Sequence, residues 1–313
     1  MTLISLLIAL ALERLVGYMS DFRRPALWLR YADGFDAVLR RLGLGYAGLR
    51  LLLVLLVPVL LVGWLSDVLD SVLLGLLWIV FSVGTVLVCL GPDDLEEDVN
   101  AYTEAVAMDD LSKQWHIAGR FLGAAEVPED PRERARAVAE AAFAESNNRI
   151  FAVVFWFALL GPTGAVLYRL VRTLAHLPLE DEKIGEVAAE EAGNPAGEER
   201  TEAAGLAAGL CALLEWLPAR LVALGYAVTG SFDHAMDSLR RLFWGDSRRM
   251  SENTRTLLMQ SGSGSARLDE LLEDEADAAV LSAVFASVIN HIHRNVIVWM
   301  TVLALFTLGG WLS

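Results

Sequence analysis

Three long runs of apolar residues constrain this chain more than any other feature of its sequence. They cover residues 51–65, 72–90 and 292–312. Each comes close to the roughly 20 residues that a helix needs to cross a hydrocarbon core about 30 Å thick. Because a backbone in lipid must satisfy its own hydrogen bonds, a helix is the element that such a run can form there. The sequence therefore predicts an all-α integral membrane protein.

Composition supports this class and excludes others. Hydrophobic residues make up 55% of the chain, above the roughly 45–50% usual for soluble domains. The formal net charge of −15 argues against nucleic acid as a partner, since phosphate binding depends on clustered Lys and Arg. The two cysteines, Cys89 and Cys211, both lie in apolar runs, so we expect buried thiols rather than a disulfide framework or a Cys-rich metal site.

The charges between the runs predict an orientation in the bacterial inner membrane. We expect transmembrane helices near residues 3–16, 51–66, 72–90 and 292–312, the first of them as an uncleaved span. The segment between the first two helices is rich in arginine, which places it in the cytoplasm by the positive-inside rule. Both chain termini then face the periplasm.

A further apolar stretch, residues 150–174, is interrupted by Gly161, Pro162 and Gly164. Irregular backbone at membrane depth is tolerated only inside protein or beside water. A full crossing would place the later arginines outside the cell, against the positive-inside rule. We therefore expect a re-entrant, broken helical hairpin with both ends in the cytoplasm.

The remaining segments are predicted to be polar parts of one membrane domain that covers residues 1–313. Residues 93–148 and 203–290 are expected to form cytoplasmic helical segments, joined to the hairpin by an acidic linker at residues 180–202. The apolar part of the second segment, residues 203–228, contains Glu215, Pro218 and Arg220, which favours a buried or interfacial helix over a crossing. Ser261–Ser265 reads as a hinge before an acidic helix at residues 268–277.

Sequence signatures of common active sites are absent. The chain contains no P-loop, GxGxxG, HExxH, GxSxG or CxxC pattern, so the catalytic residues and any cofactor are unknown at this stage and no metal site is expected. His291 and His293 lie two positions apart, about 200° around a helix, and so do not share a metal on one face. The acidic run at residues 93–98 could hold Mg²⁺, but carboxylates in a solvated first helical turn explain it more simply.

The densest polar constellation surrounds the broken segment. Glu145 and Asn148 precede it, and Tyr168 and Arg169 follow the break, so a hairpin would return all four to one membrane face. With Arg220 they form the predicted ligand-binding set, and the additional candidates are Glu13, Arg14, Trp156 and Trp216. Two structural alternatives stay open: Glu145 pairs with Arg169 only to stabilise the hairpin, and Glu13-Arg14 is an interfacial cap with a snorkelling arginine.

These motifs resemble the AmpE family of inner-membrane proteins. The resemblance rests on Met1-Thr2-Leu3 with Glu13-Arg14, on Asn148-Arg149 with Phe155-Trp156, and on Trp216-Leu217-Pro218-Ala219-Arg220-Leu221, in this order. It implies a sensor or signalling modulator in the bilayer that acts with peptidoglycan recycling and β-lactamase induction, has a functional link to the AmpD amidase and binds an anionic small molecule. A transporter is the weakest interpretation, because the four spans show no inverted repeat.

A more distant resemblance is to the CobD/CbiB membrane proteins of cobalamin biosynthesis. The positions that match that family's pattern are Glu145, Gly161, Tyr168, Arg169, Thr173, Trp216, Pro218 and Arg220. This resemblance implies the alternative function, an enzyme that uses ATP and Mg²⁺ to form or modify an amide in a cobamide or cell-wall precursor. Arg149 stands where that family has an aspartate, and Arg172 where it has an asparagine, so a cation replaces an acid suited to Mg²⁺.

Overall fold

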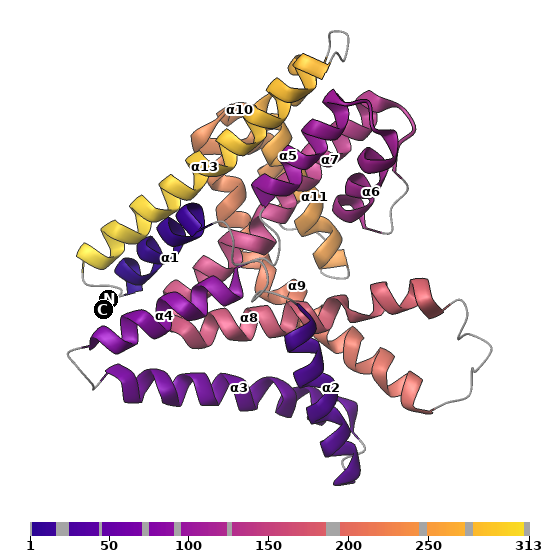
Figure 1. Ribbon diagram of the computed structural model, residues 1–313. Helices are drawn as coiled ribbons and strands as arrows, with labels where there is room; N and C mark the ends of the chain where they lie inside the picture. Colours follow the sequence, from indigo (N-terminus) through magenta and orange to yellow (C-terminus); the bar gives the residue numbers. More distant parts are fainter. Residues whose placement is uncertain are drawn as a thin grey trace. The chain divides into compact units, whose positions relative to one another are not determined.

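The computed structural model describes residues 2–16, 25–43, 46–70, 75–90, 95–123, 127–185, 195–243, 249–272 and 278–309. Every regular element in these ranges is a helix (Figure 1), which confirms the all-α prediction. The chain divides into two compact units. The first comprises Met1–Pro92, Val153–Leu214 and Leu312–Ser313, and the second comprises Asp93–Ala152 and Glu215–Trp311.

The first unit begins with four helices, of which the first, third and fourth are apolar. They are α1 (Thr2–Val16), α2 (Pro25–Arg41), α3 (Ala47–Asp70) and α4 (Leu76–Cys89). Helix α4 packs against both α1 and α3, and α2 packs against α3. The arginine-rich segment is therefore partly helical, and Asp36 of α2 accepts hydrogen bonds from Nε of Arg40 at 2.8 Å and Nε of Arg50 at 2.9 Å.

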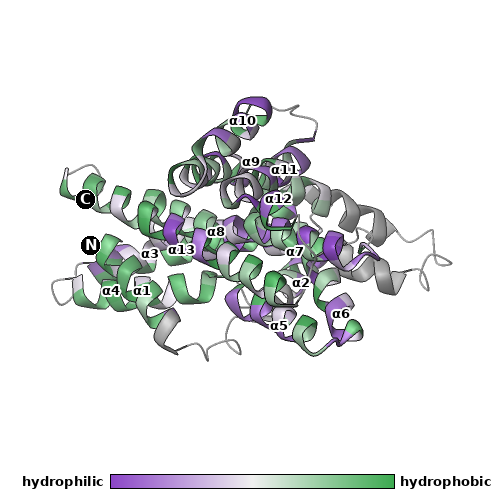
Figure 2. Cartoon of the chain, turned by 90° about the horizontal axis from the view of Figure 1, so that it is seen from above, coloured by the Kyte–Doolittle hydropathy of each residue, from purple (hydrophilic) through white to green (hydrophobic). Residues whose placement is uncertain are grey.

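Helix lengths show which segments can cross a bilayer. Within the described residues, four stretches are long and apolar enough: Gly48–Asp70, Pro131–Ala175, Ala203–Thr229 and Ala279–Leu308. On α3 large apolar side chains such as Leu60 and Trp64 stay exposed, as expected of a lipid-facing surface, and Figure 2 shows hydrophobic colouring over α1, α3 and α4. The chain is thus a multi-pass inner-membrane protein.

The predicted set of crossings differs from these candidates in two ways. Helices α1 and α4 have 15 and 14 residues, and 14 residues extend only about 21 Å at 1.5 Å per residue, which is shorter than the hydrocarbon core. Residues 203–228, for which a buried or interfacial position was expected, are long and apolar enough to cross. They form part of a single helix, α9 (Pro195–Thr229), with Pro218 inside it.

Helix α8 (Ala152–Gly185) contains the break that the sequence predicts. Gly161 has φ 66° and ψ −155°, a backbone region open essentially to glycine alone. A Cβ atom on Gly164 would overlap the carbonyl oxygen of Trp156, eight positions earlier. Those positions would lie about 12 Å apart along a continuous helix, so the chain reverses direction at Gly161.

Two contacts position this hairpin within the first unit. A Cβ atom on Gly63 of α3 would lie 3.5 Å from Oγ1 of Thr163, so the tip of the hairpin lies against α3. Nε1 of Trp156 donates to the carbonyl of Leu214 at 3.0 Å, which joins the first leg to α9. A sharp reversal that contacts α3 at its tip and α9 along its first leg is the geometry of a helical hairpin. That this hairpin enters the membrane from the cytoplasm stays a prediction.

The second unit contains the remaining helices and carries more polar surface. They are α5 (Leu95–Ala107), α6 (Leu111–Leu122), α7 (Pro131–Ser146), a π-helix (Asn147–Phe151), the end of α9, α10 (Phe232–Leu242), α11 (Met250–Ala266), α12 (Leu268–Leu271) and α13 (Ala278–Leu308). Helix α7 packs against α6, α11 and α13, and α13 also packs against α5. Ring pairs fill this core, with Phe143 5.1 Å from Tyr226 and Tyr102 5.2 Å from Phe285 between centroids.

Two segments differ from the sequence prediction, and a third is described only in part. Ser261–Ser265, predicted as a hinge, lies inside α11, because its small residues let the helix approach α7 until Gly262 touches the ring of Phe143. The predicted acidic linker is helical at both of its described ends, since α8 continues to Gly185 and α9 begins at Pro195; residues 186–194 lie outside the described residues. Of the acidic helix at 268–277 only α12 is described.

The last helix begins well before the predicted span. Helix α13 starts at Ala278, and Leu281, Val284, Phe285 and Val288 are buried on one of its faces. This i, i+3, i+4, i+7 spacing marks the side of a helix that faces a core. Helix α13 thus belongs to the second unit throughout, where it packs on α5 and α7.

Candidate functional site

The candidate site centres on the π-helix that follows α7. This short element, Asn147–Phe151, is of a kind that appears frequently at functional sites. Its Arg149 reaches α5, where Nη1 donates to Oδ2 of Asp98 at 2.7 Å. Nε of the same guanidinium lies 3.6 Å from Oε2 of Glu145, one helical turn earlier. Arg149 therefore bridges two carboxylates from different helices.

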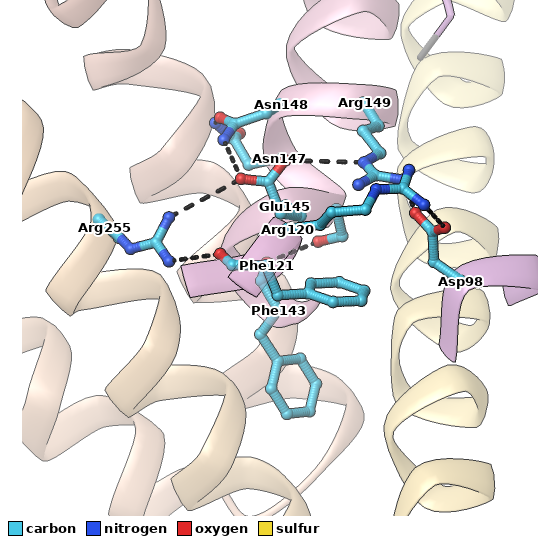
Figure 3. Close-up of polar contacts among 10 residues, drawn as sticks. Asp98, Arg120, Phe121, Phe143, Glu145, Asn147, Asn148, Arg149 and Arg255 are labelled. Atoms are coloured by element: carbon cyan, nitrogen blue, oxygen red, sulfur yellow. Dashed lines mark hydrogen bonds and ion pairs between the residues drawn. The ribbon is translucent and has the colours of Figure 1, made fainter. Parts of the chain in front are cut away.

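Two further arginines flank this bridge (Figure 3). Nη1 of Arg120 lies 3.2 Å from Oδ1 of Asp98, and Nη1 of Arg255 lies 3.8 Å from Oε1 of Glu145. Nη2 of Arg255 also donates to the carbonyl of Phe121 at 2.9 Å. We call these five charged residues, Asp98, Arg120, Glu145, Arg149 and Arg255, the guanidinium cluster.

Burial is uneven within the guanidinium cluster. The side chains of Asp98, Glu145 and Arg149 are only 11–15% exposed, whereas those of Arg120 and Arg255 are 43% and 37% exposed. The guanidinium group of Arg149 also lies 5.8 Å from the centroid of the Phe121 ring, within the range of a cation–π contact. Solvent thus reaches the cluster past its two outer arginines.

Two amides extend the cluster along the π-helix. Nδ2 of Asn148 donates to Oε1 of Glu145, and Nδ2 of Asn147 donates to Oδ1 of Asn148, each at 3.3 Å. Asn147 is fully buried, and its Oδ1 finds no hydrogen-bond partner among the described residues. A buried acceptor without a partner costs about 1–3 kcal/mol, so the Oδ1 atom of Asn147 is suited to accept a hydrogen bond next to the cluster.

The cluster does not fit the Mg²⁺ ion that the CobD/CbiB resemblance implies. Magnesium binds in proteins through one or two carboxylates whose oxygens are free to coordinate it. Here each oxygen of Asp98 and of Glu145 faces a guanidinium group. The part of the chain that the structure describes also contains no group of three or more His, Cys, Asp or Glu placed to hold a metal.

The acidic run at residues 93–98 is more than a solvated first turn. Asp98 belongs to the guanidinium cluster, and Oε2 of Glu96 lies 3.3 Å from Nε2 of His293. Asp93 and Asp94 lie outside the described residues. His291 has a separate partner, the carbonyl of Ser287, 2.8 Å from its Nδ1, so the two histidines behave as independent groups.

The predicted ligand-binding set is distributed over both units. Glu145 and Asn148 are hydrogen bonded in the second unit. Tyr168 and Arg169 are buried in the first unit, on the leg of α8 that follows the break. Their convergence with Glu145 stays a prediction.

The hydrogen-bond partners of Arg220 are neutral groups rather than Glu145, and its binding of an anion stays a prediction. Its side chain is buried, and Nη1 donates to the carbonyl of Trp216 at 3.0 Å and to Oγ1 of Thr254 at 3.1 Å. Nε donates to the carbonyl of Phe243 at 3.2 Å, and the guanidinium lies 4.4 Å from the ring centroid of Trp216. Neutral acceptors and an aromatic face therefore satisfy Arg220, which joins α9 to α11 and to the end of α10.

Two of the other candidates, Trp156 and Trp216, hold parts of the fold together. Trp156 holds the hairpin to α9, and Trp216 stacks on Arg220. Glu13 is half-buried on α1, and the side chain of Arg14 lies outside the described residues. Cys89 and Cys211 are free and buried, as predicted.

Sequence reasoning missed Arg120 and Arg255 and misjudged Asp98. Asp98 and Arg149 are 51 positions apart, and Arg255 lies on α11, so no local spacing connects them. One signal was present: Asp98 lies on the same face of α5 as the buried residues Leu95, Val99 and Tyr102. An acid in such a stripe needs a partner.

Comparison with known proteins identifies relatives over the first part of the chain. The family described as CobD/Cbib protein matches residues 6–189. The chain is 30% identical over 200 residues to the cobalamin biosynthesis protein CobD of Chromobacterium violaceum, covering 64% of this chain and 56% of the relative. It is 28% identical over 183 residues to the protein of the same name in Stutzerimonas stutzeri, covering 57% of this chain and 52% of the relative.

The extent of these matches bears on the site. The chain spans about half the length of the curated relatives it matches, and no solved structure matches it. The family match contains Asp98, Arg120, Glu145 and Arg149, whereas Arg255 lies beyond it. Most of the guanidinium cluster is thus built from the part of the chain that the family shares.

Proposed function

Because this chain belongs to the CobD/Cbib protein family, we propose that it is a membrane enzyme that forms or modifies an amide in an anionic precursor of cobamides or of the cell wall. The observation that carries the proposal is the family match over residues 6–189, which includes the π-helix and the hairpin. Both relatives are named as cobalamin biosynthesis proteins. The AmpE resemblance points instead to a cell-wall setting.

The guanidinium cluster offers two of the functions that such an enzyme needs. Arginine binds carboxylate and phosphate through paired hydrogen bonds, so the outer arginines suit the anionic part of a precursor. Glu145 is a largely buried carboxylate beside the amide of Asn148. When Arg149 and Arg255 turn to the bound anion, it suits acceptance of the proton that an amine loses when it attacks an acyl group. Tyr168 and Arg169 belong to the first unit, and their part in binding stays a prediction.

The proposed step is an acyl transfer. The amine nitrogen forms a bond to the carbonyl carbon of an acyl phosphate, and phosphate leaves with the electron pair of the broken C–O bond. ATP, the co-reactant that the CobD/CbiB resemblance implies, supplies that phosphate: a carboxylate oxygen of the precursor bonds to the γ-phosphorus, and ADP leaves. Glu145 takes the amine proton, so charge and atoms balance without a metal at the cluster.

One observation favours a second candidate, a ligand-binding sensor of the AmpE kind. Arg149 occupies the position of an acid in the CobD/CbiB pattern and pairs with both carboxylates of the cluster. A site altered in this way can keep its affinity for an anion while it loses turnover. Such a protein would report the level of a cell-wall precursor and modulate β-lactamase induction.

A deletion strain separates the two functions. Precursors of cobamides and of the cell wall are compared by mass spectrometry after deletion, and β-lactamase induction is measured in parallel. The enzyme proposal expects an anionic precursor to accumulate and to disappear when the parent protein, but not Glu145→Gln, is restored at equal protein level. Altered induction with unchanged precursors would overturn it in favour of the sensor, and no change in either readout would contradict both.

A further inference from the structure

We propose that Arg120, Arg149 and Arg255 form an oxyanion site that works without a divalent cation and binds a phosphate or carboxylate group. This inference deepens the proposed function, because it names the side chains that bind the anionic part of the precursor. It departs from the sequence prediction, which assigned that role to Arg169 and Arg220. It also assigns roles to two arginines, Arg120 and Arg255, that no sequence motif marked.

The guanidinium cluster contains more positively than negatively charged side chains. Three guanidinium groups face two carboxylates in the cluster. The cluster is also largely withdrawn from water at its centre, where Arg149 is 15% exposed. Since a positive charge in a partly buried site is stabilised by an opposite charge, an oxyanion is a ligand whose charge suits this group of arginines.

Contact distances show which arginines can turn toward a ligand. The bond from Arg149 to Asp98 is short, at 2.7 Å, and fixes the central guanidinium. The contacts from Arg255 to Glu145 and from Arg149 to Glu145 are long, at 3.8 and 3.6 Å. Replacing a long ion-pair contact by a contact to a ligand costs little free energy. Arg255 and Nε of Arg149 can therefore bind an oxyanion, while the bond from Arg149 to Asp98 keeps the cluster in place.

Phe121 brings the three arginines to one place. Arg120 is its neighbour in the chain, Arg255 donates to its carbonyl at 2.9 Å, and Arg149 lies over its ring. Both outer arginines are more than one-third exposed, so a soluble or lipid-borne anion can reach them. The unfilled acceptor on Asn147 adds a position suited to an N–H group of an amide-bearing ligand.

Inorganic pyrophosphate is a suitable probe, and isothermal titration of the detergent-purified full chain in the presence of EDTA measures its binding. The site predicts saturable binding that weakens as ionic strength rises. Arg120→Gln and Arg255→Gln should each weaken binding about ten- to a hundredfold, the value of one charge-assisted hydrogen bond. Both residues are partly exposed, so these variants are expected to accumulate even if Arg149→Gln does not.

The matched control is Arg136→Gln, which removes the same charge from the same unit. Arg136 is 48% exposed and pairs with Glu140 and Asp269, outside the cluster, so its variant should bind pyrophosphate as the parent does. Equal binding by the parent and by both outer-arginine variants would overturn the inference. Binding that appears only when Mg²⁺ is added would also overturn it, because the carboxylates would then be serving a metal.

A second arm identifies the source of the anion. Phosphatidic acid is presented in nanodiscs, with phosphatidylcholine nanodiscs as the blank, and the same variants are compared. Binding of pyrophosphate that depends on Arg120 and Arg255 assigns a soluble ligand, and the same dependence for phosphatidic acid alone assigns a lipid headgroup. Failure of both arms would remove the oxyanion site yet leave the precursor measurement in the deletion strain free to support the enzyme.

Discussion

Nη1 of Arg149 donates a hydrogen bond to Oδ2 of Asp98 at 2.7 Å, and this contact joins the π-helix after α7 to the first turn of α5. The two side chains are only 15% and 11% exposed. Removal of one partner leaves a partly buried charge, which is costly. The pair therefore stabilises the second unit as well as shaping its polar cluster.

A double-mutant cycle tests this relationship. Asp98→Asn and Arg149→Gln are each expected to lower the free energy of unfolding by about 2–4 kcal/mol, less than for a fully dry pair because water reaches the cluster. The double variant should be less destabilised than the sum of the two, by about 1–2 kcal/mol. Unfolding in detergent, followed by circular dichroism, measures all four proteins. Strict additivity would show that the two residues do not interact in solution.

The reversal of α8 makes a prediction about Gly164. A Cβ atom there overlaps the carbonyl oxygen of Trp156, so Gly164→Ala should destabilise the hairpin by at least about 2 kcal/mol. Gly84 of α4 is the control, because a Cβ atom at that position meets nothing within 4 Å. Thermal unfolding of the two variants in the same detergent compares them. An equal melting temperature for both would mean that the two legs of the hairpin are not in contact.

Tyr102 predicts a dependence of stability on alkaline pH. Burial raises the pKa of its phenol above the ordinary value, and the nearby positive charge of Arg134 partly offsets this effect. The folded state thus keeps the proton longer than the unfolded state. The resulting stability is complete below about pH 10, the ordinary pKa of tyrosine, and is lost as the pH rises toward the folded-state pKa.

The substitution Tyr102→Phe should remove the contribution of this phenol to the pH dependence of stability. Free energies of unfolding between about pH 8 and pH 11 are expected to fall less steeply for Tyr102→Phe than for the parent, by up to about 1.4 kcal/mol per pH unit. Tyr46→Phe, which changes a fully exposed ring, controls for the loss of a hydroxyl group. Parallel curves for the parent and Tyr102→Phe would contradict the prediction.

The positions of the arginines predict which segments of the chain lie on each side of the membrane. Residues 93–148 and 175–291 are expected in the cytoplasm, and both chain termini in the periplasm. Alkaline phosphatase fused within α11 should therefore be inactive, and the same enzyme fused after α13 should be active. Activity from the α11 fusion would require the hairpin of α8 or helix α9 to cross the membrane completely.

The sequence was informative where structure depends on local chemistry. Gly161 and Pro162 predicted the break in α8 because neither residue supports a regular helix at that point. The long apolar runs predicted the helical membrane class, and Cys89 and Cys211 are buried as their apolar surroundings indicated. In each case the physical cause lies within a few neighbouring residues.

Other features depend on contacts that no local pattern encodes. Ser261–Ser265 looks like a flexible hinge, but its small side chains are what allow α11 to pack on Phe143. The partners of Arg220 are two main-chain carbonyls and Thr254, and a sequence does not show which carbonyls a fold brings close. The guanidinium cluster joins five helical elements, so only the folded chain reveals it.

The central claim, that the chain is a CobD-type enzyme acting on an anionic precursor, is tested most directly by product formation. The detergent-purified protein is incubated with ATP and with the anionic precursor that accumulates in the deletion strain, together with the strain's amine pool, and the product is followed by mass spectrometry. The parent protein and Arg136→Gln should form a product that has gained the amine and lost water. Glu145→Gln should not form it. A precursor that binds to the parent protein and is recovered unchanged in the presence of ATP would contradict it.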